Sequence, residues 1–217
     1  MNETTSSRRT APCAIVRAPS PLAATRIHLA IDDLLATIRL EQRYENRESQ
    51  AIEVSYTLAV PLDAALLDVE VEIAGQKLRG LVQPKQQAEM RYEQALAEGH
   101  SAFSIRVVDG LANIALDNLK PGETLALRIV MAQWLSCNGD RVRLTLPTTL
   151  APRYGDCRLA PADQPQVDML VENAFSLSGQ VRGLLARAQL ASVTHRLAMQ
   201  ATADGMDFSI DHPRNLS

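Results

Sequence analysis

Apolar and polar residues alternate with a period of two over much of the chain between residues 27 and 146. This period is typical of strands that turn one face to a core and the other to solvent. A strand with one apolar face must bury that face against a second layer, so the pattern predicts a mainly β fold, a β-sandwich. The alternating apolar positions are Ile27, Leu29 and Ile31; Ile38 and Leu40; Ile52, Val54, Tyr56, Leu58 and Val60; Leu67, Val69, Val71 and Ile73; Leu125, Leu127, Ile129 and Met131; and Val142, Leu144 and Leu146.

One segment, residues 84–99, departs from this pattern. Its apolar residues recur at the spacing of a helix, at Ala88, Tyr92, Ala95 and Leu96. Pro84 suits the start of a helix, and Gly99 suits its end. We therefore predict one prominent helix, over about residues 85–98, within the β fold.

Composition along the chain predicts three parts. Residues 1–24 are polar and contain three arginines, which indicates a disordered basic tail. Residues 25–159 hold the sandwich and its helix. A polar, proline-bearing linker follows, and four shorter alternating runs predict a small β subdomain or bridge over residues 167–211.

Charge and composition exclude several classes of protein. A net charge of −3 and an aromatic content of 4% argue against nucleic acid as a partner. No apolar run reaches the roughly 18 residues of a membrane span. The first 25 residues lack the apolar core of a secretory signal, which predicts a cytoplasmic protein; a cell-surface or membrane-associated location would follow if the chain is a fragment.

Three cysteines, Cys13, Cys137 and Cys157, are an odd number at irregular spacing. A complete disulfide framework is therefore excluded, and free thiols are the simplest interpretation. A Cys137–Cys157 pair stays open if the chain is exported.

The sequence contains none of the common catalytic signatures. It has no nucleophile elbow, no glycine-rich phosphate loop and no zinc-ligand spacing around His28, His100, His195 or His212. We therefore predict no catalytic residue, no metal site and no cofactor. The alternative is a ligand-binding or hydrolytic β-sandwich that uses a cleft between the two β units, with His100 or His195 inside it.

Four pieces of the chain occur in the order of a known family. Asn46 ends the second strand, the helix reads A-x3-Y-x2-A-x3-G, residues 118–123 read N-x-x-P-G-E, and residues 146–154 read L-P-x-x-x-A-P-R-Y. Together they resemble the VIT domain, shared by the inter-alpha-trypsin inhibitor heavy chains and the vault poly(ADP-ribose) polymerase. The resemblance implies a β-sandwich with one helix and no active site, acting as a protein–protein interaction or scaffold module. Bacterial members are often found at the cell surface.

Family members usually precede a von Willebrand A domain, whose metal site requires D-x-S-x-S. The similar string at residues 207–211 has Asp211 where the second serine belongs, so we interpret it as a strand. The resemblance thus implies a von Willebrand A domain only outside this chain, and a protein partner of unknown identity.

Some residues are candidates for an interaction or for a structural motif. We expect Trp134 to fill the core rather than anchor an interface, and Arg153 to fix a turn rather than make an exposed contact. The candidates are Tyr92, Gly99, Pro121, Gly122, Trp134, Arg153 and Tyr154.

Overall fold

The computed structural model describes residues 21–61, 63–73, 75–79, 103–108, 111–146 and 174–210. Within these ranges the chain forms thirteen strands and one short 3-10 turn, η2 (Gly183–Leu185). Within these ranges, no helix is long and apolar enough to cross a membrane. The strands are β1 (Leu22–Asp32), β2 (Leu35–Glu45), β3 (Ile52–Ala59), β4 (Ala64–Ile73), β5 (Gln76–Arg79), β6 (Phe103–Val108), β7 (Leu111–Leu119), β8 (Thr124–Trp134), β9 (Cys137–Asn138), β10 (Arg141–Val142), β11 (Ala174–Arg182), β12 (Leu197–Ala201) and β13 (Gly205–Ile210).

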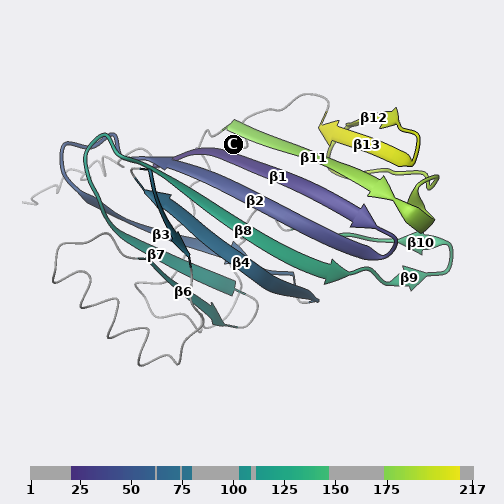
Figure 1. Ribbon diagram of the computed structural model, residues 1–217, viewed down its shortest axis with the longest axis horizontal. Helices are drawn as coiled ribbons and strands as arrows, with labels where there is room; N and C mark the ends of the chain where they lie inside the picture. The colour runs from purple at the N-terminus through teal and green to yellow at the C-terminus, as the bar shows by residue number, and fades with distance from the viewer. Residues whose placement is uncertain are drawn as a thin grey trace, which may run out of the picture.

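Eight strands form one large mixed sheet in the order β12-β13-β11-β1-β2-β8-β4-β5 (Figure 1). Neighbours are antiparallel except β1 and β11, which run parallel from Ala24 opposite Ala174 to Asp32 opposite Arg182. The strands that follow residue 166 therefore continue the large sheet through β11 instead of forming a sheet of their own. The predicted boundaries between the three parts of the chain stay a prediction.

The inner face of the large sheet carries the alternating apolar residues. Cross-strand register places them in rows; in one row Ile27 lies opposite Leu40, Leu40 opposite Ile129, and Ile129 opposite Val69. All four side chains are buried. The period-two prediction is confirmed for β1, β2 and β8, because directly opposed residues of a sheet point to the same face.

A second sheet, with the order β3-β7-β6, supplies part of the same core (Figure 1). Ala112, Ile114 and Leu119 of β7 are buried in one apolar cluster with the inner face of the large sheet. The prediction of a mainly β fold is confirmed. The described residues contain no α-helix, and the helix predicted over about 85–98 lies outside them, so it is not borne out.

Two predicted alternating runs differ in the structure. The prediction that Leu67 is buried is wrong: an irregularity between Leu66 and Asp68 shifts the register of β4, and the Leu67 side chain is 60% exposed. The run from Val142 to Leu146 gives only the two-residue strand β10, although its apolar side chains still pack against the core.

Asn46 joins two of the places where the chain passes from one sheet to the other. The connections β2–β3 and β7–β8 both make this crossing, and β2 pairs with β8 just as β3 pairs with β7. The backbone N–H of Asn46 donates to the Glu123 carbonyl at 3.0 Å, and the Asn46 carbonyl accepts from the Gly122 N–H at 2.9 Å. Gly122 has a φ of +74°, a conformation that glycine adopts without strain.

The Asn46 side chain completes this joint. It is almost fully buried, and its Nδ2 donates to the carbonyls of Leu119 at 2.7 Å and Gln50 at 2.8 Å. Its Oδ1 accepts from the Glu48 N–H at 2.9 Å. We call this set of bonds the Asn46 clasp. It gives the buried Leu119 carbonyl a donor and also bonds two partly buried backbone groups of the loop after β2.

Replacing Asn46 with alanine should lower the free energy of unfolding by about 2–4 kcal/mol, because the buried Leu119 carbonyl loses its donor. Asn46→Asp should be similarly harmful, since it cannot donate. The measurement is urea unfolding followed by circular dichroism. Ser49→Ala, at an exposed position of the same loop, is the control and should leave stability unchanged. A loss below about 0.5 kcal/mol for Asn46→Ala would contradict the clasp.

Candidate interaction surface

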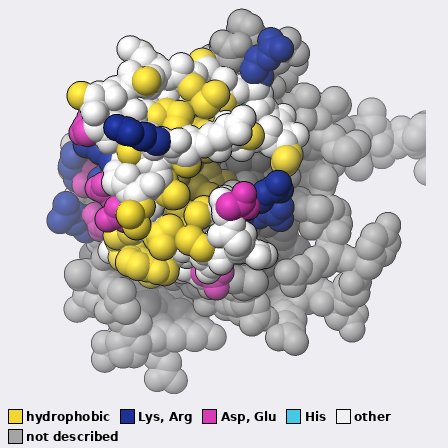
Figure 2. Space-filling model, turned by 90° about the vertical axis from the view of Figure 1, so that its right-hand side faces the viewer, with side chains coloured by type: hydrophobic (Ala, Val, Ile, Leu, Met, Phe, Trp, Pro, Cys, Tyr) yellow, Lys and Arg dark blue, Asp and Glu magenta, His cyan; other side chains and the backbone are white. Residues whose placement is uncertain are grey.

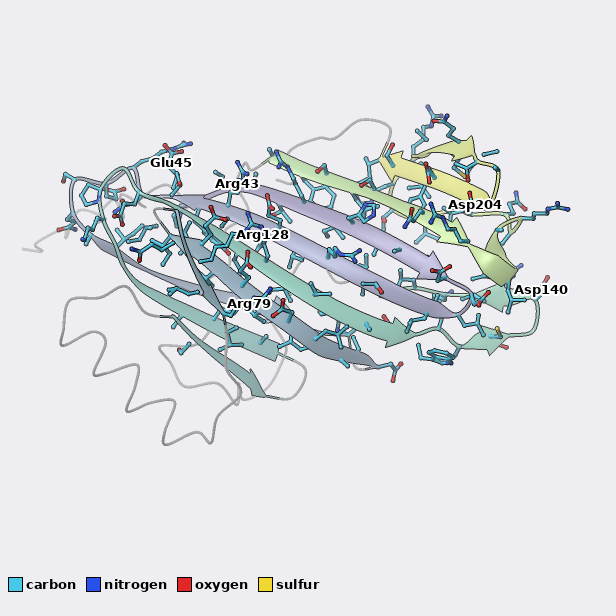
Figure 3. The ribbon with its side chains drawn as sticks, in the orientation of Figure 1. Arg43, Glu45, Arg79, Arg128, Asp140 and Asp204 are labelled. Atoms are coloured by element: carbon cyan, nitrogen blue, oxygen red, sulfur yellow. The ribbon has the colours of Figure 1, made fainter. Side chains whose placement is uncertain are left out.

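The outer face of the large sheet carries a row of alternating charges. Register alone aligns Arg26 of β1, Glu41 of β2, Arg128 of β8, Glu70 of β4 and Arg79 of β5. We call this row, together with the neighbouring Arg43, Glu72 and Lys77, the charge ladder. Figure 3 shows Arg128 near its centre, between Arg43 and Arg79.

Arg128 is the hub of the ladder. Its Nε donates to Glu41 at 3.2 Å, and its Nη1 donates to Glu70 and Glu72, each at 2.8 Å. The hydrogen bonds that the guanidinium donates to these three carboxylates, first of all to Glu72, raise the pKa of Arg128 above its ordinary value, so the guanidinium stays charged. Because one cation serves three carboxylates, the arrangement is a network and not a set of isolated pairs.

The carboxylates of the ladder respond to these cations. Burial works to raise the pKa of Glu41, but the hydrogen bond and charge of Arg128, with those of Arg43, outweigh it and hold that pKa below its usual value. The hydrogen bond from Arg128 is the main cause that lowers the pKa of Glu70, and Lys77 adds to it. Both carboxylates are therefore ionised at neutral pH, and each is hydrogen-bonded to Arg128.

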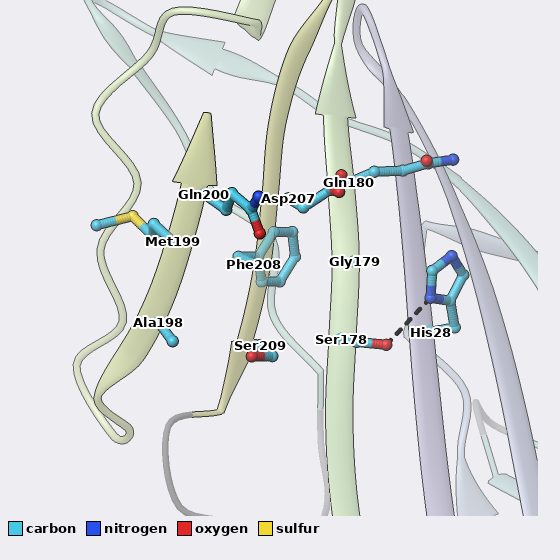
Figure 4. A pocket seen from close by; sticks show the side chains of 10 residues that line it. All are labelled: His28, Ser178, Gly179, Gln180, Ala198, Met199, Gln200, Asp207, Phe208 and Ser209. Atoms are coloured by element: carbon cyan, nitrogen blue, oxygen red, sulfur yellow. Dashed lines mark hydrogen bonds between the residues drawn. The ribbon is translucent and has the colours of Figure 1, made fainter. Parts of the chain in front are cut away.

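A shallow hollow of about 440 Å³ lies beside the ladder on the outer face, over β1, β11, β13 and β12. Figure 4 shows His28, Ser178, Gln180, Asp207 and other side chains around it. His28 Nδ1 and Ser178 Oγ are 3.2 Å apart, the one hydrogen bond between side chains drawn there. The hollow is therefore polar and open to solvent.

The hollow holds a serine, a histidine and the carboxylate of Asp207, but no hydrogen bond among the described residues joins that carboxylate to the histidine. A serine nucleophile requires a histidine oriented by an acid. Within the described ranges no carboxylate is hydrogen-bonded to His28. His195 contacts Thr194 at 2.8 Å and stacks on Phe175 with ring centroids 6.3 Å apart, while His100 lies outside those ranges.

The sequence predicts no metal site, and the structure bears on this only within the described residues. The residues that the structure describes include no group of three or more His, Cys, Asp or Glu side chains placed to hold an ion. Asp207, Phe208, Ser209 and Ile210 lie in β13, so the interpretation of this string as a strand is confirmed for these four residues, and Asp211 lies outside the described residues. Cys137 is exposed with a free thiol; Cys157 lies outside the described residues.

An apolar patch covers one end of the large sheet. Trp134, the last residue of β8, lies directly opposite Leu35 of β2; their side chains are 66% and 39% exposed. Leu66 of β4 is exposed as well, but it lies opposite Met131 and so belongs to the inner face of the sheet. Leu184 is a further exposed apolar residue at this end, because its N–H donates to Asp33 Oδ1 at 2.9 Å in the turn before β2.

Figure 2 views this end of the molecule and shows hydrophobic side chains gathered on it. The patch, which we call the Trp134 patch, comprises Leu35, Trp134 and Leu184. The expectation that Trp134 fills the core is wrong. Trp134 stands on the outer face at the end of its strand, where no second layer of described residues covers it. Clustered exposed apolar side chains are typical of protein-binding surfaces.

The other candidate residues fall into two groups. Pro121 and Gly122 form the turn that closes the Asn46 clasp, which is a structural role. Tyr92, Gly99, Arg153 and Tyr154 lie outside the described residues, so their roles stay predictions. Sequence reasoning missed the hub position of Arg128. The polar positions of β2, β4 and β8 do show opposite charges in the sequence, but only the register shows that they meet.

The charge ladder predicts a dependence of stability on acid. The pKa values of Glu41 and Glu70 are lower in the folded than in the unfolded chain, so their contribution is complete above roughly pH 4.3 and is lost as the pH falls through the folded values. Thermal melts between pH 7 and 3 should show this loss. Arg128→Met should lower the melting temperature at pH 7 by roughly 2–4 °C and make the acid loss shallower.

Arg47→Met is the matched control, because Arg47 pairs with Glu45 at 2.7 Å on an exposed loop outside the ladder. This variant should melt like the unmodified chain throughout. An acid loss as steep in Arg128→Met as in the unmodified chain would show that the ladder does not produce it.

Comparison with known proteins places these features in a family. The family model of the vault protein inter-alpha-trypsin domain matches residues 22–131. The "von Willebrand factor A domain-containing protein 5A" of Rattus norvegicus is 31% identical over 138 residues, which cover 62% of this chain and 17% of the relative. The "Protein mono-ADP-ribosyltransferase PARP4" of Mus musculus is 25% identical over 191 residues, which cover 85% of this chain and 10% of the relative.

The chain thus spans less than a fifth of each of these relatives. Among solved structures, an M1 zinc metallopeptidase from Deinococcus radiodurans covers 88% of this chain and 39% of its own, with a TM-score of 0.42 and 14% identity. A likeness of this size carries no argument about activity. The family match extends over slightly more than half of the 217 residues, from β1 to β8, and includes the Asn46 clasp. The chain belongs to the vault protein inter-alpha-trypsin (VIT) domain family.

Proposed function

We propose that this chain is a non-catalytic protein–protein interaction or scaffold module that binds a partner through the Trp134 patch. The observation that carries the proposal is the 66% exposure of Trp134 directly opposite a second exposed apolar residue, Leu35. Tryptophan is frequent among the residues that dominate binding energy at interfaces, because burying its large ring removes much apolar surface from water.

The proposed partner is a von Willebrand A domain that adjoins this module in the same protein, outside the present chain. Relatives whose printed names include this domain support the proposal. The patch supports it in a second way, because its members are uncharged and lie at the ends of strands and in a turn. A neighbouring domain can cover such an end without disturbing the hydrogen bonds of the sheet.

The hydrolytic alternative rests on the hollow and its 3.2 Å contact between His28 and Ser178. General-base chemistry at Ser178 would require a carboxylate on the far nitrogen of His28. The described geometry favours the interaction module, because exposed apolar side chains are clustered whereas no described carboxylate is hydrogen-bonded to His28.

The single tryptophan of the chain allows a direct test. The full 217-residue chain, labelled with 5-fluorotryptophan, gives one fluorine NMR signal from Trp134. Adding the unlabelled von Willebrand A domain of the rat relative should shift and broaden this signal, because the ring leaves water on docking. Leu35→Asp, which places a charge inside the patch, should remove the response.

The matched control is Val193→Asp, which adds the same charge at an exposed apolar position outside the patch. It should respond like the unmodified chain. A fluorine signal that stays unchanged at saturating concentrations of the von Willebrand A domain would overturn this proposal.

A further inference from the structure

The two edges of the large sheet differ in their chemistry. The edge strand β5 carries Lys77 and Arg79, and Lys77 pairs with Glu70 at 3.3 Å. Charged side chains at an edge discourage the addition of another strand. The opposite edge strand, β12, has the sequence LAMQA, without a charge or a proline, and four of its five residues are exposed. Among the described strands, β12 pairs only with β13.

The open backbone groups of β12 follow from its pairing. In the turn after β12, the Thr202 N–H donates to the Gly205 carbonyl at 2.9 Å. The bonds of an antiparallel pair alternate along each strand. Ala198 and Gln200 therefore direct their N–H and C=O groups toward β13, whereas Leu197, Met199 and Ala201 direct theirs to the side away from β13, where no described strand pairs. These are the groups that an added strand would bond.

Hollows border β12 on both faces of the sheet. On the outer face Ala198, Gln200 and Asp207 line the hollow of about 440 Å³ (Figure 4). On the inner face Met199 and Ala201 line a second hollow, of about 660 Å³, whose other wall is the segment 186–190. An added strand would thus find space for its alternate side chains on each face, which is how strand addition becomes selective.

The negative charge of Asp207 favours a basic side chain at one position of the added strand. Asp207 lies one strand in from the edge, directly opposite Gln200, and makes no ion pair among the described residues. A strand added to β12 would lie roughly 10 Å from β13, two strand spacings away. The side chain of a lysine or arginine can reach across this distance to a carboxylate. The inner neighbours Met199 and Ala201 favour apolar side chains instead.

We infer that β12 is the docking edge for an extended segment of a partner protein, with apolar residues at alternate positions and a lysine or arginine between two of them. This inference deepens the proposed interaction function and rests on it, but it concerns a different surface from the Trp134 patch. A second copy of the chain fits less well. Two β12 strands paired about Met199 would place Ala198 and Gln200 near each Asp207 and bring no cation to it.

The test uses fluorescein-labelled peptides and the full chain, with binding measured by fluorescence anisotropy. The probe has the sequence Thr-Val-Lys-Val-Thr, and its partner control replaces the lysine with glutamate. The lysine peptide should bind about tenfold more tightly than the glutamate peptide. Asp207→Asn should make the two affinities equal, because the carboxylate is what distinguishes them.

Met199→Pro tests the backbone contribution. It removes an N–H that points to the open side, while the bonds to β13 from Ala198 and Gln200 remain, and edge positions tolerate proline. Both peptides should lose about tenfold or more in affinity, with a thermal melt close to that of the unmodified chain. If this variant does not fold, Met199→Lys replaces it and should block the same edge with a charge.

Three results would overturn the inference: undiminished binding to the blocked edge variant, equal binding of the two peptides by the unmodified chain, or a dimer in sedimentation that the edge variant abolishes. The fluorine signal of Trp134 separates the two proposals. An edge variant that still responds to the von Willebrand A domain refutes only the peptide site, whereas an unmodified chain that binds the lysine peptide but gives no fluorine response refutes only the Trp134 patch.

Discussion

The buried carboxamide of Asn46 ties together two connections between the sheets of this protein. Two passages of the chain between the sheets, β2 to β3 and β7 to β8, run past it, and the Leu119 carbonyl on the second of them accepts one of its hydrogen bonds. A peptide group buried at such a corner has no strand partner and no water. One side chain with two donors and an acceptor satisfies several of these groups at once. The pairing of β2 with β8 and of β3 with β7 can therefore continue around the corner.

The two faces of the large sheet differ in their chemistry. The inner face is apolar and gives the core most of its buried area. The outer face is polar, and its central part is occupied by the Arg128 network. Surfaces left for partners lie at the margins of the sheet: the Trp134 patch at the ends of β2 and β8, and the uncharged edge β12. The closed centre and open margins are what a scaffold module requires, since it must bind without unfolding.

Sequence patterning predicted the parts of the fold that depend on local alternation. Ile38 and Leu40 are buried as expected, because a strand with one apolar face leaves no other choice. Leu67 was not predictable, since an irregularity of register depends on the partner strand. The parallel pairing of β1 with β11 was equally hidden, because Ile27 and Leu177 are distant in the chain. For the site, the sequence identified Trp134 as a candidate but assigned it to the core: strand alternation does not show whether a second layer extends to the end of β8. The charges around Arg128 were visible, yet their meeting depends on three separate strand registers.

The central claim is that this VIT domain acts through apolar and edge surfaces of its sheet and not through chemistry in the polar hollow. Hydrogen–deuterium exchange of the full chain, with and without the von Willebrand A domain of the rat relative, tests this claim most directly. Docking at the Trp134 patch predicts slower exchange for the amides around Leu35 and Trp134, and unchanged exchange around His28 and Ser178. Protection confined to His28, Ser178 and their neighbours, with none at the Trp134 patch, would contradict it.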